Sequence, residues 1–301
     1  MASQRDVRNR IASVQNIRKI TRAMEMVAAA RLRRAELRIA ALRPYAGAIR
    51  RMTRQAAEAA ENFPSLPILK EHGQVDSVAI LLVTGDRGLA GAFNSQIIRA
   101  GLRAAAEHEA AGRSVTFSAT GRRGVSSLIF RGHEPAGRYV GFSDRPAFAD
   151  ARDIAEDLMA AYVDEKVDQV EIFYNGYISP LSQVVRRETL LPLQQATILE
   201  AEGAGNGAPE EAGPDRALVE YEPDPEEILH RLVPDYVEIS VFRALLESTA
   251  SEHGARMTAM RSASENAGEV IDDLTLEMNR ARQAEITQEI MEVVAGAEAL
   301  S

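Results

Sequence analysis

The stretch that most constrains this chain follows Pro234 and runs to Leu300. About sixty-five residues pass there without an internal proline, with only three glycines as weak breaks. At ~1.5 Å of rise per residue, one unbroken helix of that length would be about 100 Å long. Helices of ordinary globular domains run to ~8–20 residues, so a pattern this long indicates a coiled coil, a membrane span or a repeat.

Charge and periodicity decide between these three. Charged residues recur from Glu238 to Glu298, so no window of ~18 residues is apolar enough to span a membrane. Apolar residues instead recur at steps of mostly three and four, which makes a stripe that needs a partner along its length. The stripe consists of Val241, Leu245, Thr249, Met257, Met260, Ala267, Ile271, Leu274, Met278, Ala281, Ile286, Ile290 and Val293.

A second long helix is predicted at the N-terminus, over residues 1–62. From Val7 to Leu42 the apolar and small residues recur at close to the ~3.5-residue step of a left-handed coiled coil. Pro44 is expected to interrupt or kink this helix, and Pro64 to end it. Residues 1–60 carry fourteen Arg/Lys against four Asp/Glu, whereas residues 222–301 carry seventeen Asp/Glu against six Arg. Antiparallel pairing of the two terminal helices would bury both stripes and match their charges.

The middle of the chain, residues 75–195, predicts a Rossmann-like α/β domain with a last strand that is antiparallel. Val75–Thr84 is a near-continuous apolar run, as in buried strands. Further strands are expected at residues 115–119, 139–140, 167–174 and 183–191, and helices at 94–111, 121–130 and 148–163. The segment NGYISPLS is expected to connect the last two strands.

Two segments complete the division of the chain. Residues 201–216 are rich in Gly, Ala, Pro and acidic residues, which predicts a flexible surface insertion. Residues 222–301 form the C-terminal helix, with Asp224 as its cap and Pro225 in its first turn. Because Pro234 follows soon after, it is expected either to kink this helix or to begin the main one.

Composition limits the chemistry. The chain has no cysteine, which excludes disulfides, thiolate zinc sites and a thiol switch. Five histidines are scattered without metal-ligand spacing, and no serine lies in a nucleophile-elbow context. The paired acids Asp272-Asp273 and Glu226-Glu227 are typical of solvated helix surfaces. We therefore expect no cofactor, no metal and no catalytic residue.

The loop Gly85–Asn94 follows a strand and precedes a helix, where dinucleotide folds bind phosphate. Its glycines, at positions 85, 88 and 91, match neither G-x-G-x-x-G nor a P-loop. The interpretation we favour is a tight turn in which an Asp-Arg pair packs against neighbouring backbone. A Rossmann-type nucleotide-binding enzyme with a coiled-coil arm remains the alternative.

The N-terminus begins MASQRDVRNR, without the apolar segment of a secretory signal. An organelle transit peptide is the alternative interpretation of its arginines, but the helical pattern runs on for more than fifty residues without a cleavage-like break. A scaffold that binds nucleic acid through this basic helix is a further alternative, which the acidic C-terminal run weakens because it offers an internal counter-charge.

Four blocks of the sequence resemble the gamma subunit of F-type ATP synthases, the central rotor shaft. These are RIASVQNIRKITRAMEMVAAARLRRA, LLVTGDRGLAGAFNSQI, EYEPDPEEIL and the terminal run from ASEHGARMTAM to the end. The resemblance implies an antiparallel coiled coil around an α/β domain, in a subunit that is not itself catalytic. It implies one copy per complex, in contact with the alpha/beta hexamer, the epsilon subunit and the membrane c-ring.

Further expectations follow from this resemblance. No direct binding of nucleotide or nucleic acid is expected, and the location is peripheral, on the cytoplasmic face of a bacterial rather than a mitochondrial membrane. By matching position, the catch loop of the beta subunit is contacted by Arg282, Gln283, Thr287 and Glu289. The lever of beta is contacted by Met24 with Arg22, Arg31, Arg33 and Arg34. The foot on the c-ring contains Tyr221 and Glu222.

Overall fold

The computed structural model describes residues 4–59, 66–193 and 224–298. They divide into two compact units: a helix-pair unit, Met1–Ala30 with Arg256–Ser301, and an α/β unit, Arg31–Ala255. Two long helices, α1 (Gln4–Ala59) and α6 (Pro225–Glu298), contribute to both units. The insertion expected at residues 201–216 lies outside the described residues.

The α/β unit contains a five-stranded sheet in the order β3-β2-β1-β4-β5. The first four strands along the chain are parallel neighbours, and β5 joins β4 antiparallel at one edge, as predicted. The short strand predicted near residue 139 is β3, at the other edge. The strands are β1 (Ser77–Val83), β2 (Ser114–Thr120), β3 (Gly137–Tyr139), β4 (Gln169–Ser179) and β5 (Ser182–Leu191).

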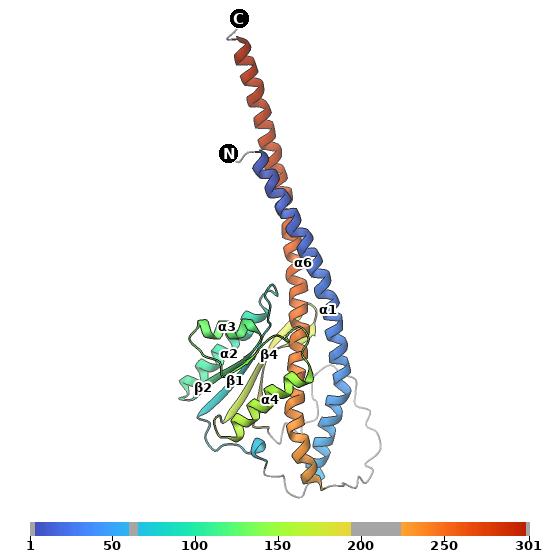
Figure 1. The fold of residues 1–301 in the computed structure, drawn as a ribbon, viewed down its shortest axis with the longest axis vertical. Helices are drawn as coiled ribbons and strands as arrows, with labels where there is room; N and C mark the ends of the chain where they lie inside the picture. Colours follow the sequence, from blue (N-terminus) through green and yellow to red (C-terminus); the bar gives the residue numbers. More distant parts are fainter. Residues whose placement is uncertain (1–3, 60–65, 194–223, 299–301) are drawn as a thin grey trace. The chain divides into compact units, whose positions relative to one another are not determined.

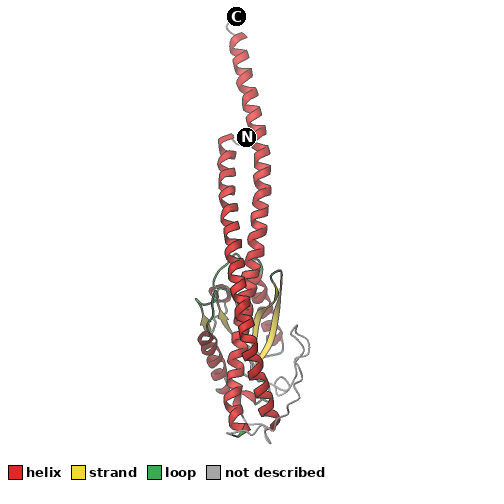
Figure 2. Cartoon of the chain, turned by 90° about the vertical axis from the view of Figure 1, so that its right-hand side faces the viewer, coloured by secondary structure: helices red, strands yellow, loops and turns green. Residues whose placement is uncertain are grey.

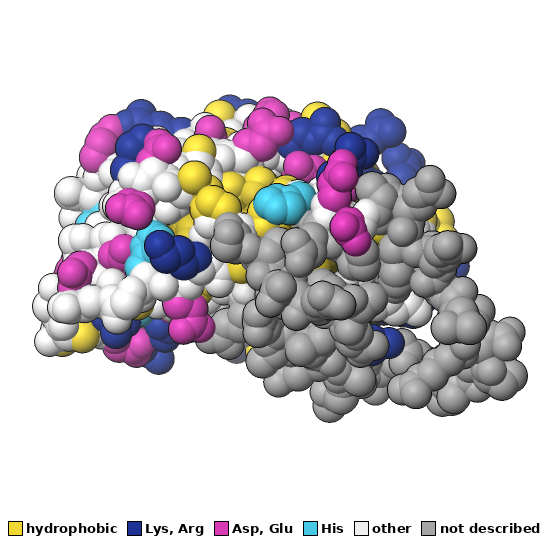
Figure 3. Space-filling model, turned by 90° about the horizontal axis from the view of Figure 1, so that it is seen from below, with side chains coloured by type: hydrophobic (Ala, Val, Ile, Leu, Met, Phe, Trp, Pro, Cys, Tyr) yellow, Lys and Arg dark blue, Asp and Glu magenta, His cyan; other side chains and the backbone are white. Residues whose placement is uncertain are grey.

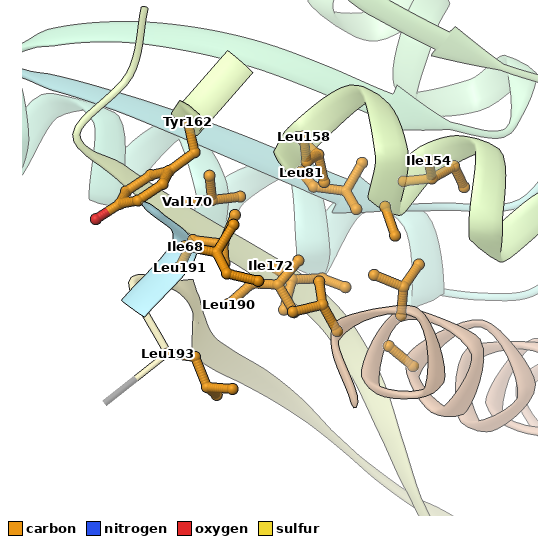
Figure 4. Close-up of a cluster of buried hydrophobic side chains, with 14 of the residues drawn as sticks. Ile68, Leu81, Ile154, Leu158, Tyr162, Val170, Ile172, Leu190, Leu191 and Leu193 are labelled. Carbon is orange, nitrogen blue, oxygen red and sulfur yellow. The ribbon is translucent and has the colours of Figure 1, made fainter. Parts of the chain in front are cut away.

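Helices cover both faces of this sheet (Figure 1). On one face, α2 (Phe93–Ala110) and α3 (Arg122–Phe130) pack against the side chains of alternate β1 residues such as Ile80. On the other, α4 (Phe148–Val163) and the first part of α6 pack around Leu81. A 3-10 turn, Pro67–Leu69, closes the end of that second core, where Ile68 lies near Leu191 and Leu193 (Figure 4). The result is a three-layer sandwich, which confirms the predicted fold class.

One predicted connection is shorter than expected. The segment NGYISPLS contributes its first five residues to β4, so only Pro180 and Leu181 separate β4 from β5. Gly176 pairs with Val184 in the ladder, and a Cβ at Gly176 would collide with the guanidinium group of Arg186. Gly176 therefore leaves room for the Arg186 side chain of the neighbouring strand, and it does not mark a loop.

Prolines also fail to break the two long helices. Pro44 lies inside α1 and Pro234 inside α6. A proline in a helix interior costs ~3 kcal/mol, because it removes a hydrogen bond and crowds the preceding turn. Packing on both sides offsets this cost, since Ala46 and Ile49 of α1 form one buried cluster with Leu232 and Ile239 of α6.

In the helix-pair unit, α1 and α6 run antiparallel and side by side (Figure 2). The Arg261 Nε donates to Glu25 Oε1 over 2.9 Å, and Gly268 lies within 3.6 Å of the Arg18 guanidinium, measured from the position of a Cβ. Most buried positions here are small or flexible: Thr21, Ala28, Met260, Ser264 and Ala267 are buried, together with Val7 and Arg256. The predicted pairing of the terminal segments is thus present within this unit.

The stability of the α/β unit should depend on pH through Asp168, which joins the starts of β1 and β4. Its carboxylate accepts the Ser77 N–H over 2.8 Å and lies 2.8 Å from His72 Nδ1. Burial raises the pKa of Asp168, but the hydrogen bonds from His72, Ser77 and Asp76 lower it to about 2. Since the folded pKa lies below the unfolded one, about 2 kcal/mol of stability is present above pH ~4 and lost as pH falls towards ~2.

Urea unfolding of the full chain at pH 3 and pH 6 tests this expectation. Asp168→Asn should destabilise the chain at pH 6 and flatten its dependence on pH. Asp164→Asn is the control, because Asp164 is 54% exposed and pairs only with the exposed Lys166. A pH dependence in Asp168→Asn equal to that of the wild type would contradict the assignment.

Candidate functional site

Asp86, just beyond β1, ties the loop Gly85–Asn94 to two neighbouring segments. Its side chain is only 8% exposed and accepts backbone N–H groups from Arg122 (3.1 Å), Gly141 (3.0 Å) and Ser143 (3.2 Å). Burial acts to raise the pKa of Asp86, but these backbone donors hold it below its usual range. The carboxylate therefore packs against neighbouring backbone, as the tight-turn interpretation predicts. The predicted Asp-Arg pair is different, because Asp86 lies 3.6 Å from Arg122 and the adjacent Arg87 lies 3.3 Å from Asp144.

The first backbone N–H groups of the loop donate to protein side chains. The Gly85 N–H donates to Asn94 Oδ1 over 2.8 Å, and the Asp86 N–H donates to the Ser143 hydroxyl over 2.9 Å. In dinucleotide folds, backbone N–H groups at this position point to a phosphate. Here the N–H groups of Gly85 and Asp86 are already occupied by the protein.

Helix α6 lies across the carboxyl ends of β1 and β4, where such a fold would bind its ligand. The Ser248 hydroxyl donates to the Val83 carbonyl over 3.4 Å, and the Ser251 hydroxyl donates to the Asn175 carbonyl over 3.0 Å. The cavity left between α6 and the sheet has a volume of only about 10 Å³. A nucleotide has no space there.

The arginines of α1 fall into two groups. The Arg31 Nη1 lies 2.7 Å from Asp144 Oδ2, which also lies 3.3 Å from Arg87 Nη1, so Arg31 is engaged inside the α/β unit. Arg33 is 74% exposed and lies 3.6 Å from Glu36, and Arg34 is exposed. In the helix-pair unit, Arg22 is exposed and Met24 half-buried.

The last turns of α6 extend past α1 (Figure 2). The register that pairs Glu25 with Arg261 would bring Gln4, the first described residue of α1, opposite the turn around Arg282. From Arg282 to Ala295 every residue is exposed, including large apolar side chains at Ile286, Ile290, Met291, Val293 and Val294. Arg282, Gln283, Thr287 and Glu289 all lie on this unpartnered segment, where the Thr287 hydroxyl donates to the Gln283 carbonyl.

Neither a metal centre nor a membrane span is found in the part of the chain that the structure describes. Within residues 4–59, 66–193 and 224–298, no group of three His, Asp or Glu side chains could hold a metal ion. Among the same residues, no helix is long and apolar enough to cross a membrane.

Comparison with known proteins decides the family. The ATP synthase family model matches residues 3–300. The ATP synthase gamma chain of Rubrobacter xylanophilus is 42% identical over 302 residues, which cover 100% of this chain and 99% of that one. The chain belongs to the ATP synthase gamma-chain family. The gamma chain of Moorella thermoacetica is similar to the same degree, at 42% identity over the full length of both chains.

Solved structures agree with this family. A chain of the Tetrahymena thermophila mitochondrial ATP synthase central stalk and c-ring is 26% identical, with a TM-score of 0.59 over 81% of this gamma chain and 99% of that chain. A chain of the Euglena gracilis mitochondrial ATP synthase has a TM-score of 0.68 over 99% of this chain and 94% of that one; at 20% identity it shows the fold alone. A gamma chain is a structural rotor subunit and not the catalytic subunit.

The structure leaves some of the predicted contact residues as predictions. The exposed positions on α1 and α6 are available to partners, and their contacts with the catch loop and lever of beta stay predictions. Tyr221 and Glu222 lie outside the described residues. Sequence reasoning missed that Asp144 engages Arg31, and it missed the polar residues with which α6 covers the sheet. The signal for the latter was available, because four of the five residues of Ser248–Glu252 are polar, inside an otherwise apolar stripe.

Proposed function

We propose that this gamma chain carries torque between a membrane c-ring and the alpha/beta hexamer of a proton-translocating ATP synthase, as a single copy that also binds epsilon. The observation that supports it best is the full-length match to gamma chains at 42% identity. We place the protein peripherally, on the cytoplasmic face of a bacterial membrane. The comparisons establish the rotor family; these partners and this location are the finer proposal.

The end of α6 supports the contact with the hexamer. A helix that presents a stripe of large apolar side chains without a partner marks a contact surface. Ile286 and Val293 are 44% and 72% exposed, so this face of the segment fits an apolar surface supplied by the hexamer. Within it, we propose that Arg282, Gln283, Thr287 and Glu289 contact the catch loop of beta.

A second exposed stripe on α1 supports the contact with the beta lever. Ile17, Ile20 and Val27 are each more than half exposed, and with Met24 they recur at steps of three and four. Arg22 flanks this stripe, and Arg33 and Arg34 are exposed further along the helix. An acidic lever with an apolar side would match this surface. Arg31 would have to leave Asp144 to take part, so we expect it to contribute less.

The lower part of α1 offers a surface for epsilon. Leu37, Tyr45 and Met52 are each about half exposed and recur at helical spacing, with Arg51 beside them. Seen from the end where α6 begins, the α/β unit also shows hydrophobic side chains gathered beside a histidine and charged groups (Figure 3). Tyr221 and Glu222 precede this start of α6 in the chain, which is why we propose that they belong to the foot on the c-ring.

The exposed arginines of α1 should matter for coupling. Arg33→Gln with Arg34→Gln should lower ATP-driven proton pumping about twofold in the assembled complex, because each exposed ion pair contributes only ~0–1 kcal/mol. Arg103→Gln, on an exposed position of α2, is the control. Pumping at the wild-type rate in the double variant would count against the lever assignment.

Co-expression with alpha and beta subunits of a bacterial relative tests the proposed function. The chain should co-purify with both subunits in one copy, and the complex should hydrolyse ATP. Calorimetry on the chain alone should detect no binding of ATP or NAD. Nucleotide binding by the isolated chain, without assembly, would favour the enzyme alternative instead.

A further inference from the structure

The crevice at the end of the sheet holds a segment of the same chain. The strand order reverses direction around β1, and in open α/β sheets the crevice at such a point binds a ligand. Ser248 and Ser251 of α6 bond to one carbonyl on each side of it, Val83 at the end of β1 and Asn175 in β4. The helix therefore bridges the two central strands at the position of a ligand.

Glu252 is the residue of this segment that lies closest to the loop after β1. This residue is 1% exposed, and a Cβ placed on Gly85 would lie 2.8 Å from both Cδ and Oε2 of Glu252. The carboxylate thus lies directly over Gly85, and no larger residue fits at that position without displacing it. The remaining cavity of about 10 Å³ is at the lower limit for one water molecule.

We infer that Ser248–Glu252 occupies the crevice of the α/β unit in place of a ligand. We infer further that the contact between the Glu252 carboxylate and Gly85 transmits torque from the sheet to α6. The inference rests on the proposed rotor function. Asp86 immobilises the loop that carries Gly85, through three backbone N–H groups, so the contact has a rigid base. Helix α6 then continues without interruption to Glu298. Force applied to the sheet passes into α6 at this contact.

The polar contacts of α1 with the sheet and its loops are partly exposed, although Ala56 and Ala57 of α1 are buried in the core around Leu81. The Tyr177 hydroxyl donates to Glu36 Oε1 over 2.6 Å, and Arg31 pairs with Asp144 with both side chains about one-third exposed. Exposed pairs of this kind contribute little individually. Among these polar contacts, the buried one on α6 is therefore the one that we assign to coupling.

A matched set of variants in the assembled, membrane-reconstituted complex tests this assignment. Gly85→Ala pushes a methyl group into the Glu252 carboxylate, and Glu252→Asp shortens that side chain by one methylene. The measured quantity is the ratio of protons pumped to ATP hydrolysed. Gly85→Ala should lower this ratio about threefold, and the double variant Gly85→Ala/Glu252→Asp should recover at least about half of the loss. Gly73→Ala, in open space, is the control.

An unchanged ratio in Gly85→Ala, or a loss that Glu252→Asp does not rescue, overturns the inference. If Gly85→Ala does not accumulate as folded protein, the same ratio is measured for Ser251→Ala. This variant removes only the hydrogen bond between the segment Ser248–Glu252 and the Asn175 carbonyl. A lowered ratio at an unchanged Tm supports the contact, and an unchanged ratio overturns it. Failure of the proposed function looks different, since the wild-type chain would then neither assemble nor support pumping.

Discussion

Ala28→Glu should lower coupled ATP synthesis about tenfold, whereas Ala30→Glu should leave it nearly unchanged. Ala28 is 1% exposed, and the helix register brings it opposite the turn of α6 around Thr258. A glutamate there would have to bury an unpaired carboxylate or push the helices apart. Either outcome loosens the paired structure that a rotor needs in order to resist twisting.

Ala30 is the matched control because it lies two residues further along α1 and is exposed. ATP synthesis and hydrolysis are measured in the same vesicles, so that a coupling defect is separated from failed assembly. We expect hydrolysis to persist in Ala28→Glu while synthesis falls. Equal synthesis by the two variants would show that tight pairing at this position is not required.

Arg187→Ala should destabilise the α/β unit by about 1–3 kcal/mol, because it leaves a buried carboxylate without its charged partner, although the Arg187 side chain is itself 41% exposed. Glu171 is only 3% exposed, and both of its carboxylate oxygens accept from Arg187, Oε2 from Nε over 3.0 Å and Oε1 from Nη2 over 2.9 Å. His108 Nε2 lies 3.3 Å from the same carboxylate. Removing the guanidinium deprives Glu171 of its bidentate partner and leaves the Gln169 amide, which donates to Oε1 over 3.0 Å, beside the carboxylate.

The double variant Arg187→Met/Glu171→Met distinguishes this reason from a loss of packing. Replacing both members of a buried pair by apolar residues is often close to neutral, so the double variant should be more stable than Arg187→Ala. Urea unfolding of the full chain, followed by circular dichroism, measures both. A double variant as unstable as the single one would mean that the pair contributes through packing and not through charge.

The elements that a local sequence pattern defines could be predicted from the sequence. Helix α4 begins and ends where predicted, at Phe148 and Val163, and the predicted helix 94–111 is α2, one residue displaced at each end. Gly112, at a φ of 82°, adopts the left-handed conformation expected of a glycine that follows a helix. In each case a local pattern is sufficient for the prediction: the spacing of apolar residues for the two helices, and turn chemistry for Gly112.

Features that depend on distant partners were not predictable. Pro44 was expected to interrupt α1, but the residues that compensate for it, Leu232 and Ile239, lie almost two hundred positions away in the sequence. Arg31 resembles its exposed neighbours Arg33 and Arg34 in sequence, and only the fold brings Asp144 to it. The same holds for Gly85, whose role as a close-approach site depends on Glu252.

Rotation of the chain itself is the most direct test of the rotor account. Because the chain has no cysteine, a cysteine introduced at the exposed Ala110 of α2 gives a unique attachment point for a bead. With the alpha/beta hexamer fixed to a surface and ATP supplied, the bead should turn continuously in one direction. A bead that stays still while the same complexes hydrolyse ATP would contradict the account.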